Sequence, residues 1–245
     1  MTELESSAPH LANATTRVDV VSWGAQPDAV AGASQSSGRV LFKGPNNRPE
    51  AGLWICTPGR WRLAVPRDEL CYFVVGRADY LRDNGERVEI LPDTLVLFPG
   101  GWSGECTVHE TLRNTYMLTA EDRAGGADLP PPPAPNLLSP LAQTALVDWG
   151  IIPTMLAGQS HTSGKLLHKG PQGRSECGIW RCTPGRWNCH VTRDEFCHFL
   201  AGRSTYVHAS GEVIEITPDT VAFFPQDWQG VCTVHETVTK VYMIR

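Results

Sequence analysis

The sequence of 245 residues lacks any long apolar run: one of its longest, residues 94–98, ends at Pro99 and Gly100. A membrane span needs about 18 consecutive apolar residues, so none is expected. There is also no block of lysine or arginine, and 21 basic against 26 acidic residues leave a net charge of −5. We therefore expect neither nucleic acid nor a membrane surface as a partner. The N-terminal segment has no basic start followed by an apolar stretch, which favours a cytoplasmic protein over a secreted one.

Three further patterns are missing. No two of the 8 cysteines form a CxxC pair, so the common zinc-ribbon and thioredoxin-like spacings are absent. No glycine-rich loop precedes a helix, which leaves nucleotide chemistry without support. No long segment shows helical periodicity. In a cytoplasmic protein the cysteines are expected to be reduced thiols.

An internal duplication dominates what is present. Residues 22–118 align without a gap on residues 148–244, at an offset of 126, and about half of the aligned positions are identical. GLWICTPGRW, for example, returns as GIWRCTPGRW. Each copy is domain-sized, unlike a solenoid repeat. The predicted organisation is a flexible lead-in (1–21), a first domain (22–120), a Pro-rich linker (121–146) and a second domain (147–245).

Within each copy, short stretches rich in Val, Ile, Phe, Tyr and Trp alternate with turn signals such as Asp83-Asn84-Gly85. This pattern predicts an all-β unit of about eight strands. So many short strands in a domain of this size favour a closed barrel or jelly roll, which leaves no exposed sheet edges.

Two motifs in each copy resemble those of the cupin superfamily. Glu69 and Glu195 are each followed after six residues by a glycine, Gly76 and Gly202, and a second motif begins with PDT at positions 92 and 218. With WxCTPGRW and the terminal VHET segment, they resemble the branch that includes ureidoglycine aminohydrolase and the ethanolamine-utilisation cupin. The resemblance implies a bicupin, two tandem double-stranded β-helix barrels.

That resemblance also implies a divalent metal, Mn, Fe, Ni or Zn, held by two histidines and a glutamate of the first motif and one histidine of the second. Here the pattern is broken, and the ureidoglycine reaction is not transferred. His190 and Glu195 remain, which makes the C-terminal barrel the candidate metal site. The corresponding positions are Arg62, Ala64, Glu69 and Gly104 in the first copy, and Asn188, His190, Glu195 and Gly230 in the second.

Strand alternation from the motif glutamate predicts two inward carboxylates beside two inward thiols in each barrel. Two carboxylates in a cavity of low dielectric push one pKa up, as general acid–base catalysis requires, so Glu195 and Glu236 are the candidate catalytic pair. The alternative is that each glutamate pairs with an inward arginine, such as Arg60 or Arg186, and serves only structure. The inward sets are Glu69, Cys71, Cys106 and Glu110, and Glu195, Cys197, Cys232 and Glu236.

The remaining candidates define a ligand pocket. His198 and His208 are expected to face solvent, and buried cysteines are most often small core residues. Trp228 and the other repeated tryptophans are expected mostly to fill the core, and Trp228, which follows a proline turn near the barrel mouth, would also wall a cavity. The predicted pocket residues are Trp180, Cys197, Phe199, Trp228 and Cys232, with Glu69 and Glu110 in the first barrel.

The functional hypothesis is a bicupin that binds a small polar metabolite in its C-terminal barrel. It extends to metal-assisted or acid–base chemistry on a small organic acid, amine or amide. The alternative is a non-catalytic bicupin, binding a small molecule or a partner, that has lost the metal site. The duplication satisfies a cupin dimer contact within one chain, so both a monomer with an internal pseudo-dimer and a homodimer are expected states.

Overall fold

The computed structural model describes residues 7–44, 49–119, 136–170 and 175–245. The chain forms two compact units, Thr15–Pro140 and Leu141–Arg245, the second completed by the N-terminal residues through Ala14. The 3₁₀ turn η1 (Ala14–Thr16) is the only helical element in these ranges, so nothing there is long and apolar enough to cross a membrane as a helix. The all-β prediction is confirmed.

The strands follow the duplication. The N-terminal unit contains β2 (Val21–Ala25), β3 (Ala29–Ala31), β4 (Gln35–Lys43), β5 (Glu50–Cys56), β6 (Gly59–Val65), β7 (Glu69–Arg82), β8 (Arg87–Ile90), β9 (Thr94–Phe98), β10 (Trp102–Leu118) and β11 (Asn136–Leu138). The C-terminal unit contains β1 (His10–Leu11), β12 (Val147–Ile151), β13 (Met155–Gly158), β14 (His161–Lys169), β15 (Glu176–Cys182), β16 (Gly185–His190), β17 (Glu195–His208), β18 (Val213–Ile216), β19 (Thr220–Phe224) and β20 (Gln229–Ile244).

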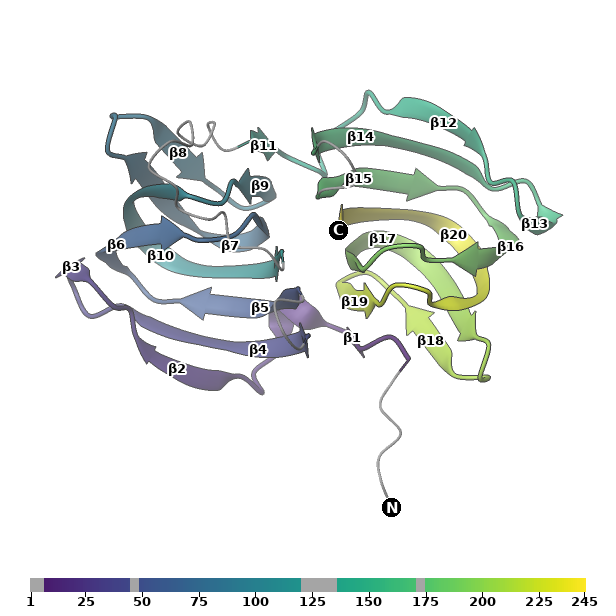
Figure 1. The fold of residues 1–245 in the computed structure, drawn as a ribbon, viewed down its shortest axis with the longest axis horizontal. Helices are drawn as coiled ribbons and strands as arrows, with labels where there is room; N and C mark the ends of the chain where they lie inside the picture. Colours follow the sequence, from purple (N-terminus) through teal and green to yellow (C-terminus); the bar gives the residue numbers. More distant parts are fainter. Residues whose placement is uncertain (1–6, 45–48, 120–135, 171–174) are drawn as a thin grey trace, which may run out of the picture. The chain divides into compact units, whose positions relative to one another are not determined.

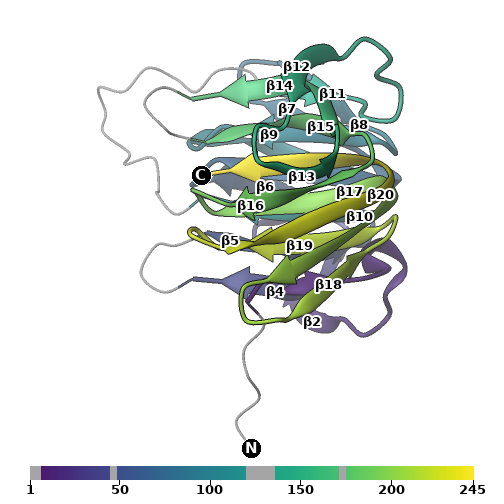
Figure 2. The same ribbon diagram turned by 90° about the vertical axis from the view of Figure 1, so that its right-hand side faces the viewer.

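Each unit is one antiparallel sheet that two long strands fold into two layers (Figure 1). In the N-terminal unit, the first half of β7 pairs with β9 and its second half with β8, while β10 pairs first with β6 and then with β5. One layer is therefore β3-β6-β10-β7-β8 and the other β2-β4-β5-β10-β7-β9-β11. The C-terminal unit repeats this order, with β17 and β20 side by side (Figure 2). The prediction of two tandem cupin barrels is confirmed.

The long strands bend where a glycine adopts a positive φ. Gly76 has a φ of 92°, and a Cβ there would lie 2.3 Å from the carbonyl oxygen of Thr111 on β10. Opposite this point the ladder shifts register, and residues 109–111 are all exposed between buried Val108 and Leu112. A β-bulge of this kind interrupts the alternation of side chains between the two faces. Gly202, with a φ of 83°, repeats the bend in β17.

An aromatic cluster packs in the core of each barrel. In the C-terminal unit, Trp228 is 2% exposed and meets Phe224 edge to face, with ring centroids 5.2 Å apart. Tyr206 contacts both rings, at 5.0 and 6.0 Å. Tyr80, Phe98 and Trp102 form the same cluster in the N-terminal unit.

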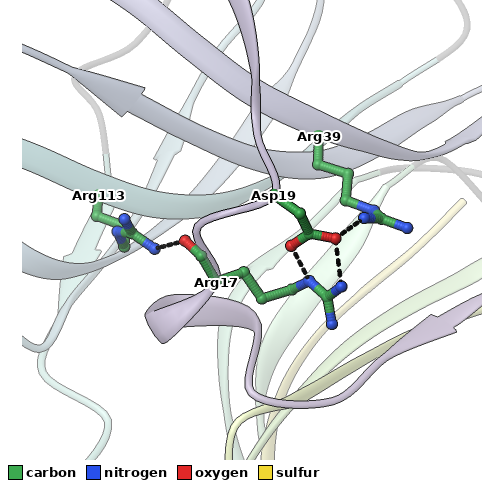
Figure 3. Close-up of polar contacts among 4 residues, drawn as sticks. All are labelled: Arg17, Asp19, Arg39 and Arg113. Atoms are coloured by element: carbon green, nitrogen blue, oxygen red, sulfur yellow. Dashed lines mark hydrogen bonds and ion pairs between the residues drawn. The ribbon is translucent and has the colours of Figure 1, made fainter.

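Residues 7–20 differ from the expected flexible lead-in. His10 pairs with Ala222 through the β1–β19 ladder, and the backbone carbonyl of Arg17 accepts a hydrogen bond of 2.8 Å from Arg113 Nη1. Asp19 forms ion pairs with Arg17 and Arg39 (Figure 3). Backbone pairing and charge pairing anchor a segment that a composition-based argument assigned to solvent. The Pro-rich run 130–135 lies outside the described residues, whereas β11 pairs with β9.

Candidate functional site

Each barrel contains a cavity between its two layers that is partly open to solvent. The cavity measures about 310 Å³ in the N-terminal unit and about 270 Å³ in the C-terminal unit. These volumes lie at the lower end of the roughly 300–1,000 Å³ that small-molecule pockets span, which suits a small ligand. In both cavities the walls combine two carboxylates with aromatic rings.

The first carboxylate is the motif glutamate, Glu69 on β7 and Glu195 on β17, as the resemblance implied. The second is Glu50 or Glu176, at the start of β5 or β15, which sequence reasoning missed. Tyr116 Oη donates to Glu50 Oε1 at 3.0 Å, and Tyr242 Oη donates to Glu176 at 3.3 Å. Strand alternation could have predicted Glu50 as a cavity residue. It lies four residues before the cavity-lining Trp54 and therefore on the same face of the strand.

Lys240 is the other functional residue that sequence reasoning missed. Its side chain is 8% exposed, and its Nζ lies 2.7 Å from Glu195 Oε1 and 3.2 Å from Cys197 Sγ. The ammonium also stands over the Trp180 ring, 4.8 Å from the centroid. Burial opposes the charged form, but Cys197 and Glu195 outweigh it and raise the pKa of Lys240 above its ordinary value. The Lys240 ammonium therefore stays charged at neutral pH.

The N-terminal cavity has no lysine at this position. Residue 114, the counterpart of Lys240, is an asparagine that lines the cavity and is 1% exposed. Glu69 accepts a hydrogen bond from Cys71 Sγ at 3.4 Å. Burial raises the pKa of Glu69, and the hydrogen bond from Cys71 and the charge of Arg67 offset this rise only in part. The same thiol loses acidity, because burial and the adjacent Glu69 raise the pKa of Cys71.

The prediction that Glu110 and Glu236 face the barrel interior is wrong. Their side chains are 64% and 57% exposed and pair with Arg77 and Arg203 on the outer face. The bulge opposite each bend glycine puts three consecutive residues outward, so counting in twos from Val108 or Val234 fails. The alternative, in which an inward glutamate pairs with Arg60, is not seen either, because Arg60 Nε lies 3.4 Å from Glu105 Oε1.

His190 does not approach Glu195. It is exposed, and its Nε2 lies 3.5 Å from Asp227 Oδ1. The inward positions near the end of β16 are Cys189 and the following Val191, one residue out of register with the expected pair at 188 and 190. A difference of one residue in register moves every side chain of a strand to the other face, so His190 is directed away from the cavity.

The expected divalent metal therefore lacks its ligands. Among the described residues, no group of three or more His, Cys, Asp or Glu side chains is placed to hold a metal ion. The one motif ligand in the C-terminal cavity, Glu195, already accepts from the Lys240 ammonium, whose charge opposes a second cation. The donor set does not fit Mn, Fe, Ni or Zn.

The predicted pocket residues divide into two groups. Trp180 and Glu69 line the cavities, as does Glu195, which was predicted as a catalytic and metal-binding residue. Cys197, Phe199, Trp228 and Cys232 are at most 2% exposed and pack behind the walls, where the layers interdigitate. Trp228 belongs to the aromatic core, as expected of the repeated tryptophans, but it does not wall the cavity, because Phe224 and Tyr206 cover its ring.

His198 is also not where it was expected. It is 1% exposed, and its Nε2 lies 3.1 Å from Asp219 Oδ1. Tyr72 Oη makes the equivalent contact with Asp93, at 3.0 Å, in the other barrel. In each barrel, a polar side chain of β7 or β17 that faces away from the cavity therefore contacts the aspartate in the turn before β9 or β19.

All eight cysteines lie within the described ranges and are free thiols. Cys189 is the most accessible of them, and burial raises its pKa to about 12. Burial likewise raises the pKa of Cys182 to about 11. The thiolate is the reactive form of cysteine, so the raised pKa makes these two thiols poor nucleophiles at neutral pH.

The sequence profile of the EutQ-like cupin domain matches residues 43–116 and 169–242, which together make up more than half of the chain. This chain belongs to the EutQ-like cupins. The two matches contain both motif glutamates and both residues of the 114/240 pair, so the family domain coincides with the cavities. No protein of curated function matches the sequence.

Solved structures share this EutQ-like bicupin fold at low sequence identity. A protein of unknown function from Pseudomonas syringae pv. tomato is 15% identical, with a TM-score of 0.74 over 97% of this chain and 99% of that one. A cupin 2 conserved barrel domain protein from Leptotrichia buccalis is 9% identical, with a TM-score of 0.60 over 85% and 88%. A variant of Bacillus subtilis oxalate decarboxylase is 11% identical, with a TM-score of 0.53 over 96% and 76%. These likenesses concern the fold alone.

Proposed function

We propose that this EutQ-like bicupin binds small polar molecules inside its barrels and does so without a metal at the family position. The observation that carries the proposal is the Glu195–Lys240 pair, which supplies from the protein itself the positive charge that a metal would bring to Glu195. A charged group buried beside a cavity needs a partner, and here a lysine takes that role.

The cavity walls support binding over a purely structural role for the barrels. Glu50 and Glu69, and likewise Glu176 and Glu195, reach the cavity surface instead of being packed solid. Two fixed polar positions between aromatic rings are typical of a site that orients a small molecule with polar ends. The proposed ligands are small organic acids, amines or amides.

Cavity-filling variants test this proposal. Leu63 and Cys189 are equivalent cavity residues, whereas the adjacent Ala64 and His190 are exposed. We would screen a panel of small acids, amines and amides for an increase in Tm. A ligand at a hundred times its Kd stabilises by about 2.7 kcal/mol. Leu63→Trp or Cys189→Trp should abolish the increase, and Ala64→Trp and His190→Trp should retain it. Stabilisation that survives both cavity-filling variants, or no stabilisation by any compound, would contradict the proposal.

Acid–base chemistry is a second candidate, favoured by Glu69. Burial raises the pKa of this cavity carboxylate, which moves it toward the range that a general acid needs. If the barrel is catalytic, Glu69→Gln should abolish turnover of a bound amide while the substrate still raises Tm. Turnover that is unchanged in Glu69→Gln would remove this candidate.

A further inference from the structure

The two barrels are copies of one sequence, so each provides an internal reference for the other. Asn114 pairs in register with Phe73, as Lys240 pairs with Phe199, and both residues line their cavities. The side chain at this position is cationic in one barrel and neutral in the other. Lys240 supplies a positive charge in the C-terminal cavity, and the N-terminal cavity lacks that charge at the equivalent position.

Lys240 places an ammonium group at one point in its cavity. Glu195 Oε1 lies 2.7 Å away, Cys197 Sγ lies 3.2 Å away, and the Trp180 ring faces the charge at 4.8 Å. A carboxylate and an aromatic face together are the two partners that favour an organic ammonium ion. This point is an ammonium subsite that the protein fills with its own side chain.

The N-terminal barrel keeps the walls of that subsite. Glu69, Cys71 and Trp54 occupy the equivalent positions, and all three line the cavity of about 310 Å³. Asn114 is shorter than lysine and brings no charge. Within the described part of the chain, the hydrogen bond that Glu69 accepts comes from a thiol, which is a weak donor.

Asn114 itself adds an unused acceptor. The residue is 1% exposed, yet its Oδ1 has no hydrogen-bond partner among the described residues. Buried polar atoms are nearly always satisfied, so an orphaned acceptor on a cavity wall points to a donor that comes from elsewhere. The cavity wall therefore holds a carboxylate whose donor is a weak one, a thiol, and, just beneath the surface, a carbonyl oxygen that has no donor among the described residues.

We infer that the N-terminal barrel binds a small organic ammonium ion, with its N–H groups on Glu69 and Asn114 and its charge over Trp54. The inference rests on the proposed function, because it names the ligand class of one proposed binding cavity. A metal ion does not suit the same position, because no group of three ligating side chains surrounds it within the described residues.

The probe is n-butylammonium, which reproduces the lysine side chain from its β-carbon outward, and the matched neutral compound is n-butanol. Isothermal titration calorimetry of the wild-type chain should give one n-butylammonium per chain and at least tenfold weaker binding of n-butanol. Asn114→Lys should fill the subsite from within and weaken n-butylammonium binding at least tenfold. Glu69→Gln, which keeps the shape of the side chain, should weaken it to a similar extent.

The reciprocal substitution, Lys240→Asn, is the most stringent test of the inference. Lys240→Asn empties the C-terminal subsite and should raise the stoichiometry from one to two n-butylammonium ions per chain. Circular dichroism would establish that each variant is folded. Equal affinity for n-butylammonium and n-butanol, or wild-type binding by both Asn114→Lys and Glu69→Gln, would overturn the inference. If other compounds of the panel still stabilise the chain and Leu63→Trp abolishes that effect, the proposed function stands and only the ammonium assignment fails.

Discussion

Lys240 and Asn114 occupy the same position in two copies of one barrel, and they give the two cavities different charge. Lys240 Nζ lies 2.7 Å from the motif carboxylate Glu195, whereas Asn114 leaves the motif carboxylate Glu69 without an ammonium partner among the residues that the structure describes. A single difference between the repeats thus separates a cavity with an internal ion pair from one with an excess of acceptors. The predictions below depend on this difference and on the strand bend that shapes both barrels.

Lys240→Met should destabilise the chain strongly, because it leaves the Glu195 carboxylate without its partner. Removing one member of a buried ion pair costs about 3–5 kcal/mol. Urea denaturation monitored by tryptophan fluorescence would measure the loss. The double variant Lys240→Met/Glu195→Gln removes the unpaired charge and should recover most of the stability. A loss below about 1 kcal/mol in the single variant would show that the pair is not buried as described.

The pH dependence of stability should differ between the wild-type chain and Glu69→Gln. Because burial raises the pKa of Glu69 in the folded state, its favourable contribution is present below the ordinary value of 4.5 and is lost as the pH rises through the folded pKa. The two proteins should therefore be equally stable at low pH, and the wild type should become the less stable one as the pH rises above about 4.5.

Thermal unfolding of both proteins across the range from pH 3.5 to about 8, without added amine, would measure this divergence. Glu110→Gln is the control, because it removes an exposed carboxylate and should change stability by no more than about 0.5 kcal/mol. A wild type that gains stability over Glu69→Gln as the pH rises would contradict the account.

Gly202→Ala should disrupt the bend of β17. Gly202 has a φ of 83°, and a Cβ there would lie 2.2 Å from the carbonyl oxygen of Thr237. The left-handed conformation alone costs a residue with a Cβ about 1–2 kcal/mol, and the clash adds to it. Gly211→Ala is the matched control, since its φ is 91° and nothing lies within 4 Å. Equal losses of unfolding free energy in the two variants would show that the close approach of β17 and β20 is unimportant.

Much of the fold follows from the sequence, because its signals are local and repeated. The duplication, the alternation and the turn residues predict two all-β barrels, and the motif glutamates reach the cavities as predicted. Glu110 and Glu236 do not, because a bulge opposite Gly76 and Gly202 breaks the alternation from which their orientation was inferred. A bulge depends on how two distant strands pair, and the bulged residues themselves have no distinctive sequence. The only sequence signal is the glycine on the opposite strand.

The candidate site was less accessible to sequence reasoning. The prediction of His190 as a ligand assumed that residues 188 and 190 of β16 face inward, whereas residues 189 and 191 do so. A shift of one residue turns every side chain of a strand to the other face. Lys240 was overlooked because a lysine near the end of a strand is usually exposed. Its burial depends on Glu195 across the sheet, a pairing that only the folded chain reveals.

The most direct test of metal-independent barrels is the metal content of the protein itself. We would incubate the wild-type chain with Mn²⁺, Fe²⁺, Ni²⁺ or Zn²⁺, remove free ions by gel filtration, and measure bound metal by elemental analysis, with Glu195→Gln and His190→Ala in parallel. The account predicts far less than one metal ion per chain in every case and no difference between the three proteins. Near-stoichiometric metal in the wild type that is lost in Glu195→Gln would contradict it.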